Sequence, residues 1–372
     1  MDSKTVKIII PCYRERLTNS EKISLLQCKR ILHNYPLCII KPSNLSLQIE
    51  EMQGVEIEEF DQEWFQSIQT YNDLMLTQQF YERFCDYEYI LIYQLDAFVF
   101  RDELSFFCSM GYDYIGAPWL YGQFIYVNGK GGYYYVGNGG LSLRKVRSHL
   151  DILKKTRVND IVNEDMFFSS REQEGFRVAP LEIALKFAFE ATVRKCYERN
   201  SMEMPFGCHA WQKYDFTFYQ KIFREFGYDT TDIRDEKYDK NKYNEFCDLS
   251  KLDEGTFRDV LKSVLPNILN EVWIWGAGQI GKECGWLLQR NRIEIKGYVD
   301  SNEKMKGTYL YTKRVISTSE FLERDDETLI IIAMAEMPEE IVHTLKEHHK
   351  VEGKDYISWK RFRKECCRMI ER

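Results

Sequence analysis

The chain of 372 residues lacks the features that mark several common protein classes. It has no apolar run near the roughly 20 residues that a membrane-spanning helix requires. Its N-terminus carries only the short apolar run Ile8 to Ile10 before Pro11, far shorter than the core of a signal peptide. We therefore expect a cytoplasmic protein.

Excess basic charge and regularly spaced cysteines are also missing. The formal net charge is -7 and the basic clusters are local, so no positive field favours nucleic acid as a partner. The 11 cysteines are odd in number and scattered without metal-ligand spacing. We expect most of them to be reduced thiols packed as small hydrophobic side chains. Internal repeats and low-complexity tracts are absent as well.

The length suggests two domains. From about Lys4 to Tyr228, strand-like runs alternate with helical segments, which predicts an α/β domain with a mainly parallel sheet. A polar, charged stretch follows and reads as a linker with a short helix. A strand, a glycine-rich turn and a helix then begin abruptly. We predict a first domain over 1–228, a connector over 229–265, a second domain over 266–360 and a basic tail over 361–372.

One carboxylate of the first domain, Asp96, lies within "YILIYQLDAFVFRD", a run otherwise suited to a buried strand and its exit loop. An unpaired charge there would cost several kcal/mol, so something must compensate it. The carboxyl end of a parallel strand is where α/β sheets bind ligands, and a divalent cation would neutralise the charge. The alternative is hydrogen bonding to a helix N-terminus or to loop amides.

Three more features of the first domain carry chemistry, and each has a plainer alternative. "YVGNGGLSLR" is a glycine turn entering a strand, which is either a tight turn or a close backbone approach to a sugar. "NEDMFFS" opens a helix with two acids, a pattern that also simply suits the helix dipole. "PFGCHAW" contains His209, whose alternative is an interior histidine with satisfied hydrogen bonds.

Residues from about 4 to 228 resemble a family of glycosyltransferase-like domains with the GT-A architecture of nucleotide-sugar transferases, often left as a domain of unknown function. The resemblance rests on these motifs together with "YQLDAFVF" and "YDYIGAPW". The resemblance implies a D-x-D motif that holds Mn or Mg on the donor diphosphate. Asp96 would be its second acid and His209 a late metal ligand. Asp165 or Glu164 would be the acid that faces the acceptor. Gln94 stands where the first Asp would be, and it can hydrogen bond but adds no negative charge.

The chemistry of glycosyl transfer agrees with these roles. The leaving diphosphate needs stabilisation, and an inverting reaction needs a base near the acceptor hydroxyl, which Asp165 fits. In a retaining reaction Asp165 would position the acceptor instead. The predicted donor-side residues are Gln94, Asp96, Arg14, Asn138, Gly139 and Gly140, and the predicted acceptor-side residues are Trp119 and Trp211. Solvation is the alternative for Arg14, and core packing is the alternative for the aromatic side chains.

The second domain begins with "VWIWGAGQIG", a glycine fingerprint formed by Gly276, Gly278 and Gly281, and Asp300 follows the next predicted strand. The region from about 270 to 359 resembles small Rossmann-like domains of sugar-modifying enzymes. That resemblance implies a nucleotide, dinucleotide or sugar nucleotide at the turn, and a fold relic with an empty site is the alternative. Tyr309 and the lysine four residues later have Y-x-x-x-K spacing, but a turn or short strand is expected there, so we predict no hydride transfer.

The sequence as a whole predicts a glycosyltransferase that moves a sugar from a nucleoside diphosphate sugar to a saccharide or lipid-linked acceptor in surface polysaccharide assembly. The alternative is a non-catalytic sugar-nucleotide-binding or sensor protein. The basic tail "WKRFRKECCRMIER" is either an ordinary solvated helix or a peripheral contact with the inner face of a membrane.

Overall fold

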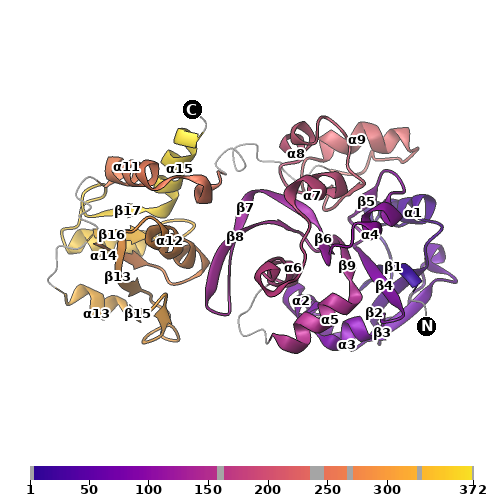
Figure 1. Ribbon diagram of the computed structural model, residues 1–372, viewed down its shortest axis with the longest axis horizontal. Helices are drawn as coiled ribbons and strands as arrows, with labels where there is room; N and C mark the ends of the chain where they lie inside the picture. The colour runs from indigo at the N-terminus through magenta and orange to yellow at the C-terminus, as the bar shows by residue number, and fades with distance from the viewer. Residues whose placement is uncertain (1–3, 157–162, 235–246, 266–270, 325–328, 371–372) are drawn as a thin grey trace. The chain divides into compact units, whose positions relative to one another are not determined.

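The computed structural model describes residues 4–156, 163–234, 247–265, 271–324 and 329–370. The chain divides into two compact units. The first comprises Met1–Leu120 and Tyr134–Asp239, and the second comprises Tyr121–Tyr133 and Lys240–Arg372. Each unit combines helices with a six-stranded sheet (Figure 1), which confirms the predicted α/β class.

The main sheet of the first unit has the strand order β3-β2-β1-β4-β9-β6. The pairs from β3 to β4 are parallel, and β9 runs antiparallel to both β4 and β6, which confirms a mainly parallel sheet. Its strands are β1 (Lys4–Pro11), β2 (Leu37–Pro42), β3 (Glu56–Phe60), β4 (Tyr87–Tyr93), β6 (Tyr114–Ile115) and β9 (Leu141–Lys145). Strands β1 and β4 are almost wholly buried, as their near-continuous apolar runs predict.

The apolar run around Asp96 forms two strands instead of one. Strand β4 ends at Tyr93, and a turn closed by a hydrogen bond from Ala97 N to Gln94 O (2.8 Å) separates it from β5 (Phe98–Val99). Strand β5 belongs to a separate sheet of order β10-β11-β5, completed by β10 (Ala188–Phe189) and β11 (Gly207–Cys208). Asp96 therefore lies in a tight connection between two sheets.

Helices surround these sheets. The α-helices of the first unit are α1 (Asn19–Ile31), α2 (Ile68–Met75), α3 (Gln78–Glu82), α4 (Leu104–Ser109), α5 (Val146–Lys155), α6 (Glu164–Ser169), α7 (Leu181–Phe187), α8 (Val193–Arg199) and α9 (Phe216–Glu225), with 3₁₀ turns η1 (Glu50–Met52), η2 (Gln62–Phe65) and η3 (Glu172–Glu174). The periodic segment before β4 is divided into α2 and α3 because Thr77 caps the second helix, its hydroxyl accepting from Phe80 N.

A long two-stranded hairpin is shared between the two units. It consists of β7 (Ala117–Val127) and β8 (Lys130–Gly137), and its tip, Tyr121–Tyr133, belongs to the second unit. Phe124 and Tyr126 at the tip are buried in the hydrophobic core of that unit. No sequence pattern indicated that residues from the middle of the predicted first domain belong to the core of the second unit.

The sheet of the second unit has the order β14-β15-β13-β12-β16-β17, parallel except for β14. The elements are η4 (Leu249–Lys251), α11 (Glu254–Val264), β12 (Glu271–Trp275), α12 (Gln279–Arg290), β13 (Glu294–Val299), β14 (Tyr309–Leu310), β15 (Lys313–Ile316), α13 (Thr318–Leu322), β16 (Leu329–Ile332), α14 (Glu339–Glu347), β17 (Tyr356–Ser358) and α15 (Trp359–Ile370). Tyr309 and Lys313 lie on the antiparallel pair β14 and β15, as expected for a turn or short strand.

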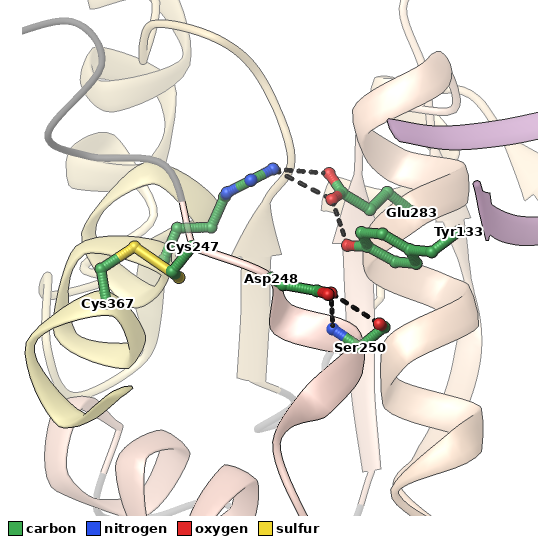
Figure 2. Close-up of a disulfide and its surroundings, with 7 residues drawn as sticks. Tyr133, Cys247, Asp248, Ser250, Glu283 and Cys367 are labelled. Atoms are coloured by element: carbon green, nitrogen blue, oxygen red, sulfur yellow. Dashed lines mark hydrogen bonds and ion pairs between the residues drawn. A yellow bond between two sulfur atoms is a disulfide. The ribbon is translucent and has the colours of Figure 1, made fainter. Parts of the chain in front are cut away.

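The C-terminal helix α15 is integrated into the second unit. Trp359, Phe362 and Cys366 are buried in its core, so the apolar face of the basic tail packs inside the protein. Figure 2 shows the disulfide that joins Cys247 to Cys367 of α15. The nine other cysteines are free thiols. Within the described ranges, no helix is long and apolar enough to span a bilayer.

A carboxylate of α12 fixes the hairpin tip and α15 to the same helix. Glu283 accepts a hydrogen bond from Tyr133 Oη (2.5 Å), as Figure 2 shows, and another from Arg363 Nη1 (3.0 Å). Glu283 is buried, and a buried carboxylate is stable only when it is paired and hydrogen bonded. The hairpin tip is therefore tied to the second unit by a charged hydrogen-bond network as well as by apolar packing.

Candidate active site

The candidate site of the first unit lies at the carboxyl end of β4. Because β9 runs antiparallel to β4 and Tyr93 pairs with Leu141, the glycine turn before β9 lies beside the residues that follow β4. The backbone N–H of Gln94 donates to Gly140 O (2.9 Å). Strand pairing thus brings two of the predicted motifs together, at the sheet edge where α/β proteins bind ligands.

The smaller sheet brings in the third motif. Cys208 pairs with Phe98 of β5, so the next residue, His209, reaches the turn that contains Asp96. On the other side, β10 is parallel to β11, and the N–H of His209 donates to Phe189 O (2.9 Å). Glu190 follows Phe189 directly and lies against the same histidine.

His209 bridges two carboxylates. Its Nε2 lies 3.0 Å from Asp96 Oδ1 and 3.2 Å from Gln94 Oε1, and its Nδ1 lies 3.0 Å from Glu190 Oε2. The His209 side chain is 11% exposed, whereas that of Asp96 is 49% exposed. The charge of Asp96 is therefore compensated within the chain by an imidazole, while part of its carboxylate stays open to solvent.

The electrostatics of this pair follow from its geometry. Burial alone would lower the pKa of His209, but the charges of Asp96 and Glu190 outweigh it and raise that pKa well above its usual value. Burial would also raise the pKa of Asp96, and the charge and hydrogen bond of His209 reverse this, so that the pKa of Asp96 is lowered. Asp96 is thus held ionised.

The glycines of the turn make room for functional side chains. A Cβ on Gly139 would overlap the carboxylate of Glu164, and one on Gly140 would overlap the imidazole of His209. A Cβ on Gly137 would overlap the indole of Trp119. The absence of side chains here is thus explained by close packing of the surrounding groups of the site.

The two acids at the start of α6 have different surroundings. Glu164 is buried and forms an ion pair with the fully buried Arg144 (Oε1 to Nη2, 2.9 Å), while its backbone N–H donates to Asn72 Oδ1 (3.0 Å). Asp165 is only partly buried, and its Oδ2 accepts from the N–H of Asn138 in the glycine turn (3.0 Å). Glu164 therefore serves in a buried ion pair, and Asp165 is the less buried of the two acids; a catalytic role for either stays a prediction.

Asp165 has the electrostatics of a general base. Burial, followed by repulsion from Glu164, raises its pKa to about 7, although hydrogen bonding to Met166 N opposes the shift. A base whose pKa lies near the working pH combines a usable ionised fraction with proton affinity.

Of the two predicted acceptor-side tryptophans, only Trp119 lies at the turn. Its Nε1 donates to Asn138 Oδ1 (3.0 Å), and it is partly exposed. Trp211 is a correction: it is completely buried against Phe223 and donates to Ser24 Oγ (3.2 Å), so it has no surface to offer an acceptor. Aromatic content alone could not distinguish these two environments.

Arg14 follows β1, the parallel neighbour of β4, and so stands at the same edge of the sheet. Its side chain is half-exposed, and its Nη1 lies 3.4 Å from Glu21 Oε1 at the start of α1. The strand order places β2 and β4 on opposite sides of β1, the topology at which doubly wound sheets bind nucleotides. A donor contact by Arg14 stays a prediction.

The donor set at the end of β4 fits a divalent cation only in part. No cluster of three or more His, Cys, Asp or Glu side chains arranged to hold a metal occurs among the residues that the structure describes. Asp96, Gln94 and His209 offer a carboxylate, an amide oxygen and an imidazole, all of which Mn accepts. Cations at phosphate sites often use one or two protein carboxylates and take further ligands from the phosphates. The residues therefore fit a cation shared with a diphosphate.

The glycine turn of the second unit has a different construction. A Cβ on Gly281 would overlap Gly276 O, so this glycine permits close packing of the turn on α12, and Gly276 has a positive φ of 110°. Gly278 has nothing within 4 Å of its Cβ direction. Asp300 Oδ2 accepts from Ala277 N (2.7 Å), so this carboxylate supports the turn itself. Nucleotide binding here stays a prediction.

Sequence reasoning did not single out Glu190 or Arg144. Glu190 directly follows the apolar run Phe187–Phe189, as Asp96 follows the apolar run of β4. A carboxylate at the end of a buried apolar run was therefore the signal that could have identified Glu190. Arg144 follows Leu143 in a buried strand and could have been recognised as a charge in need of a partner.

Comparison with known proteins gives partial matches. Residues 54–209 match the model of a family described as "Protein of unknown function (DUF5672)", and residues 268–356 match one described as "C2185-like, N-terminal". No curated protein matches the chain.

Several solved structures are similar in fold. The apo-form glycosyltransferase GlyE of Streptococcus pneumoniae TIGR4 shares 10% identity with a TM-score of 0.39, covering 95% of this chain and 91% of its own. A glycosyltransferase involved in glycosylating the major capsid of PBCV-1 shares 13% at a TM-score of 0.36, covering 59% and 99%. The bifunctional WbbM shares 12% at 0.36, covering 56% of this chain and 46% of its own. These are likenesses of fold, and the function proposed below is inferred from the residues of this chain.

Proposed function

We propose that the chain is a glycosyltransferase that moves a sugar from a nucleoside diphosphate sugar to a saccharide or lipid-linked acceptor, in surface polysaccharide assembly. The observation that carries this is the glycine turn, which contacts both halves of the site. Gly140 packs against His209, the partner of Asp96, and the N–H of Asn138, two residues earlier, donates to Asp165. The proposed donor-binding residues and the proposed base thus lie on either side of one turn.

On the donor side, Asp96 and His209 would hold a divalent cation together with the diphosphate, and Gln94 would add an amide oxygen or bind a hydroxyl group. When bound, such a cation supplies Lewis-acid stabilisation of the leaving diphosphate. The chain's own contribution is to keep Asp96 ionised and half-exposed at the sheet edge.

On the acceptor side, Asp165 would accept the proton of the attacking hydroxyl group in an inverting reaction. Its hydrogen bonds to Asn138 N and Met166 N orient the carboxylate, and Trp119 holds Asn138 from the other side. The amide Nδ2 of Asn138 is buried without a protein partner in the described structure. A buried polar atom calls for a hydrogen-bond partner, and a sugar hydroxyl is a chemically suitable one.

A second candidate function is a non-catalytic sugar-nucleotide-binding or sensor protein. The observation that favours it is the His209 bridge, because Asp96 is neutralised without a cation and Gln94 adds no second charge. Under this proposal the same residues bind donor, and Asp165 contributes nothing to turnover. The glycine turn of the second unit is proposed, under either function, to bind a nucleotide or sugar nucleotide.

The test is a thermal-shift screen of nucleotide sugars with Mn²⁺ and with a chelator, because a ligand that binds only the folded state raises the unfolding midpoint. The expected result is a shift in Mn²⁺ that Asp96→Ala and His209→Ala reduce. Asp102→Asn, at an exposed carboxylate further along the same segment, is the matched control and should behave as the native protein. No shift with any nucleotide sugar would contradict both candidate functions, and binding without transfer to any acceptor would favour the sensor.

A further inference from the structure

The carboxylate of Glu190 has no role in the function proposed so far, although it lies within hydrogen-bond distance of a proposed cation ligand. It follows β10, whose partner β11 directly precedes His209, so two adjacent strands fix both backbones. The His209 N–H bond to Phe189 O locks their register one residue before Glu190. The contact between the two side chains is thus a consequence of strand pairing.

The two ring nitrogens of His209 face different kinds of group. Nδ1 lies 3.0 Å from Glu190 Oε2, whereas Nε2 lies 3.0 Å from Asp96 Oδ1 and 3.2 Å from Gln94 Oε1. A carboxylate can only accept, so the Nδ1 contact requires a proton on Nδ1. By the same rule the Nε2 contact with Asp96 requires a proton on Nε2 when no cation is bound. A cation that binds together with Asp96 would displace this proton, and Nε2 is then the nitrogen that binds it, because Nδ1 still donates to Glu190.

The surroundings prevent the ring from choosing another orientation at low cost. His209 is 11% exposed and Glu190 is 12% exposed, so both are held within the protein. The imidazole also fills the space next to Gly140 where a Cβ would stand. Of the two carboxylates beside the ring, Glu190 is the less exposed, with 12% of its side chain exposed against 49% for Asp96.

We propose that Glu190 is a positioning residue that orients His209 so that Nε2, together with Asp96, faces a divalent cation. This inference rests on the proposed function for the existence of that cation. Histidines that bind metals commonly donate their other N–H to a carboxylate, and loss of such a partner typically weakens metal binding by about 10- to 100-fold.

The experiment measures Mn²⁺ affinity of the full chain, alone and with inorganic pyrophosphate in place of the donor diphosphate, from the electron paramagnetic resonance signal of the ion that is not bound to protein. Glu190→Leu should weaken binding by about 10- to 100-fold. Glu190→Gln keeps an oxygen that can accept from Nδ1, so its loss should be smaller. This order, with the amide partly rescuing affinity, is a readout that general loss of stability would not produce.

Asp215→Asn is the matched control. Asp215 is a buried carboxylate of the same unit, and its Oδ2 lies 2.6 Å from Arg194 Nε. Its loss therefore perturbs a comparable ion pair that includes neither His209 nor Glu190. Its Mn²⁺ affinity should equal that of the native protein. If Glu190→Leu does not fold, Glu190→Gln against Asp215→Asn still decides the question.

The outcomes separate this inference from the proposed function. Native Mn²⁺ affinity in both Glu190 variants would overturn the positioning role alone. Absence of Mn²⁺ binding in the native protein, both alone and with pyrophosphate, would overturn both the cation and this role. Weakened Mn²⁺ binding in the Glu190 variants, in a protein that transfers no sugar, would support the positioning role and contradict only the transferase.

Discussion

Each unit contains a glycine turn next to the carboxyl end of a buried strand. In the first unit the turn before β9 lies beside the end of β4, and in the second unit the turn follows β12. The glycines of the two turns nevertheless serve different purposes. In the first unit the space beside Gly139 and Gly140 is taken by Glu164 and His209. In the second unit Gly281 packs on backbone, and Gly278 has nothing within 4 Å. A glycine-rich motif therefore indicates close approach, but only the structure shows whether the approaching group is the chain's own side chain or open space.

The difference bears on what each turn can do. Atoms of the first turn contact side chains from three segments, namely β7, α6 and the residues after β11. The second is a helix N-terminus supported by Asp300, with room next to Gly278 for an incoming phosphate. Chemistry is expected at the first turn and binding at the second.

The largest expected effect concerns the base beside the first turn. Asp165→Asn keeps the shape of the side chain and removes its ability to take a proton, so turnover should fall by about 100- to 10,000-fold while donor binding is unchanged. Steady-state transfer and donor calorimetry measure the two quantities. Near-native turnover would show that Asp165 does not act in the reaction, and the expected contrast between chemistry at the first turn and binding at the second would be lost.

The next effect tests the packing of the first turn. Gly140→Ser places a side chain where His209 lies, and such overpacking typically costs about 1 to 3 kcal/mol of unfolding free energy. Mn²⁺-dependent donor binding should fall as well because the imidazole is displaced. Chemical denaturation measures the free energy of unfolding. A variant as stable as the native protein would show that the turn and His209 can shift to accommodate a side chain at little cost.

A third prediction concerns pH. The pKa of Asp165 is raised to about 7, so the ionised base, and with it the turnover, should fall about tenfold for each pH unit below that value. The folded state also holds this proton more tightly than the unfolded chain, so this group's contribution to the unfolding free energy decreases as the pH rises from about 4 to about 7. Asp165→Asn should lack both dependences. If the turnover of the native protein is the same from about pH 5 to about pH 8, Asp165 is not the base.

The sequence allowed much of this arrangement to be predicted, for reasons that differ by residue. Asp96 was recognisable because a charge in an apolar run needs a partner, and the glycine turn because its spacing is unusual. The contact of Glu190 with His209 depends on pairing between two-residue strands, which leave no periodic signal in a sequence.

Burial was the other property that the sequence could not supply. Trp119 and Trp211 are the same residue type near the same motifs, and only tertiary packing decides that one meets Asn138 and the other lies in the core. Phe124 and Tyr126 likewise read as ordinary strand residues of the first domain, and their place in the core of the second unit follows from where a long hairpin ends.

The smallest expected effect applies the substitution used at Gly140 to the second turn. Gly278 has a φ of -73°, which any residue can adopt, and it is the N-cap of α12, a position that favours serine. Gly278→Ser should therefore change the unfolding free energy by no more than about 0.5 kcal/mol, against the loss expected for Gly140→Ser.

A larger branched side chain fills the open space, so Gly278→Val should abolish nucleotide binding to this turn, measured by calorimetry with a panel of nucleotides and sugar nucleotides. Site attribution comes from Asp96→Ala, which should leave that binding intact. Equal destabilisation by serine at both turns would contradict the contrast drawn between them, and nucleotide binding that survives Gly278→Val would show that the open space is not where the phosphates approach.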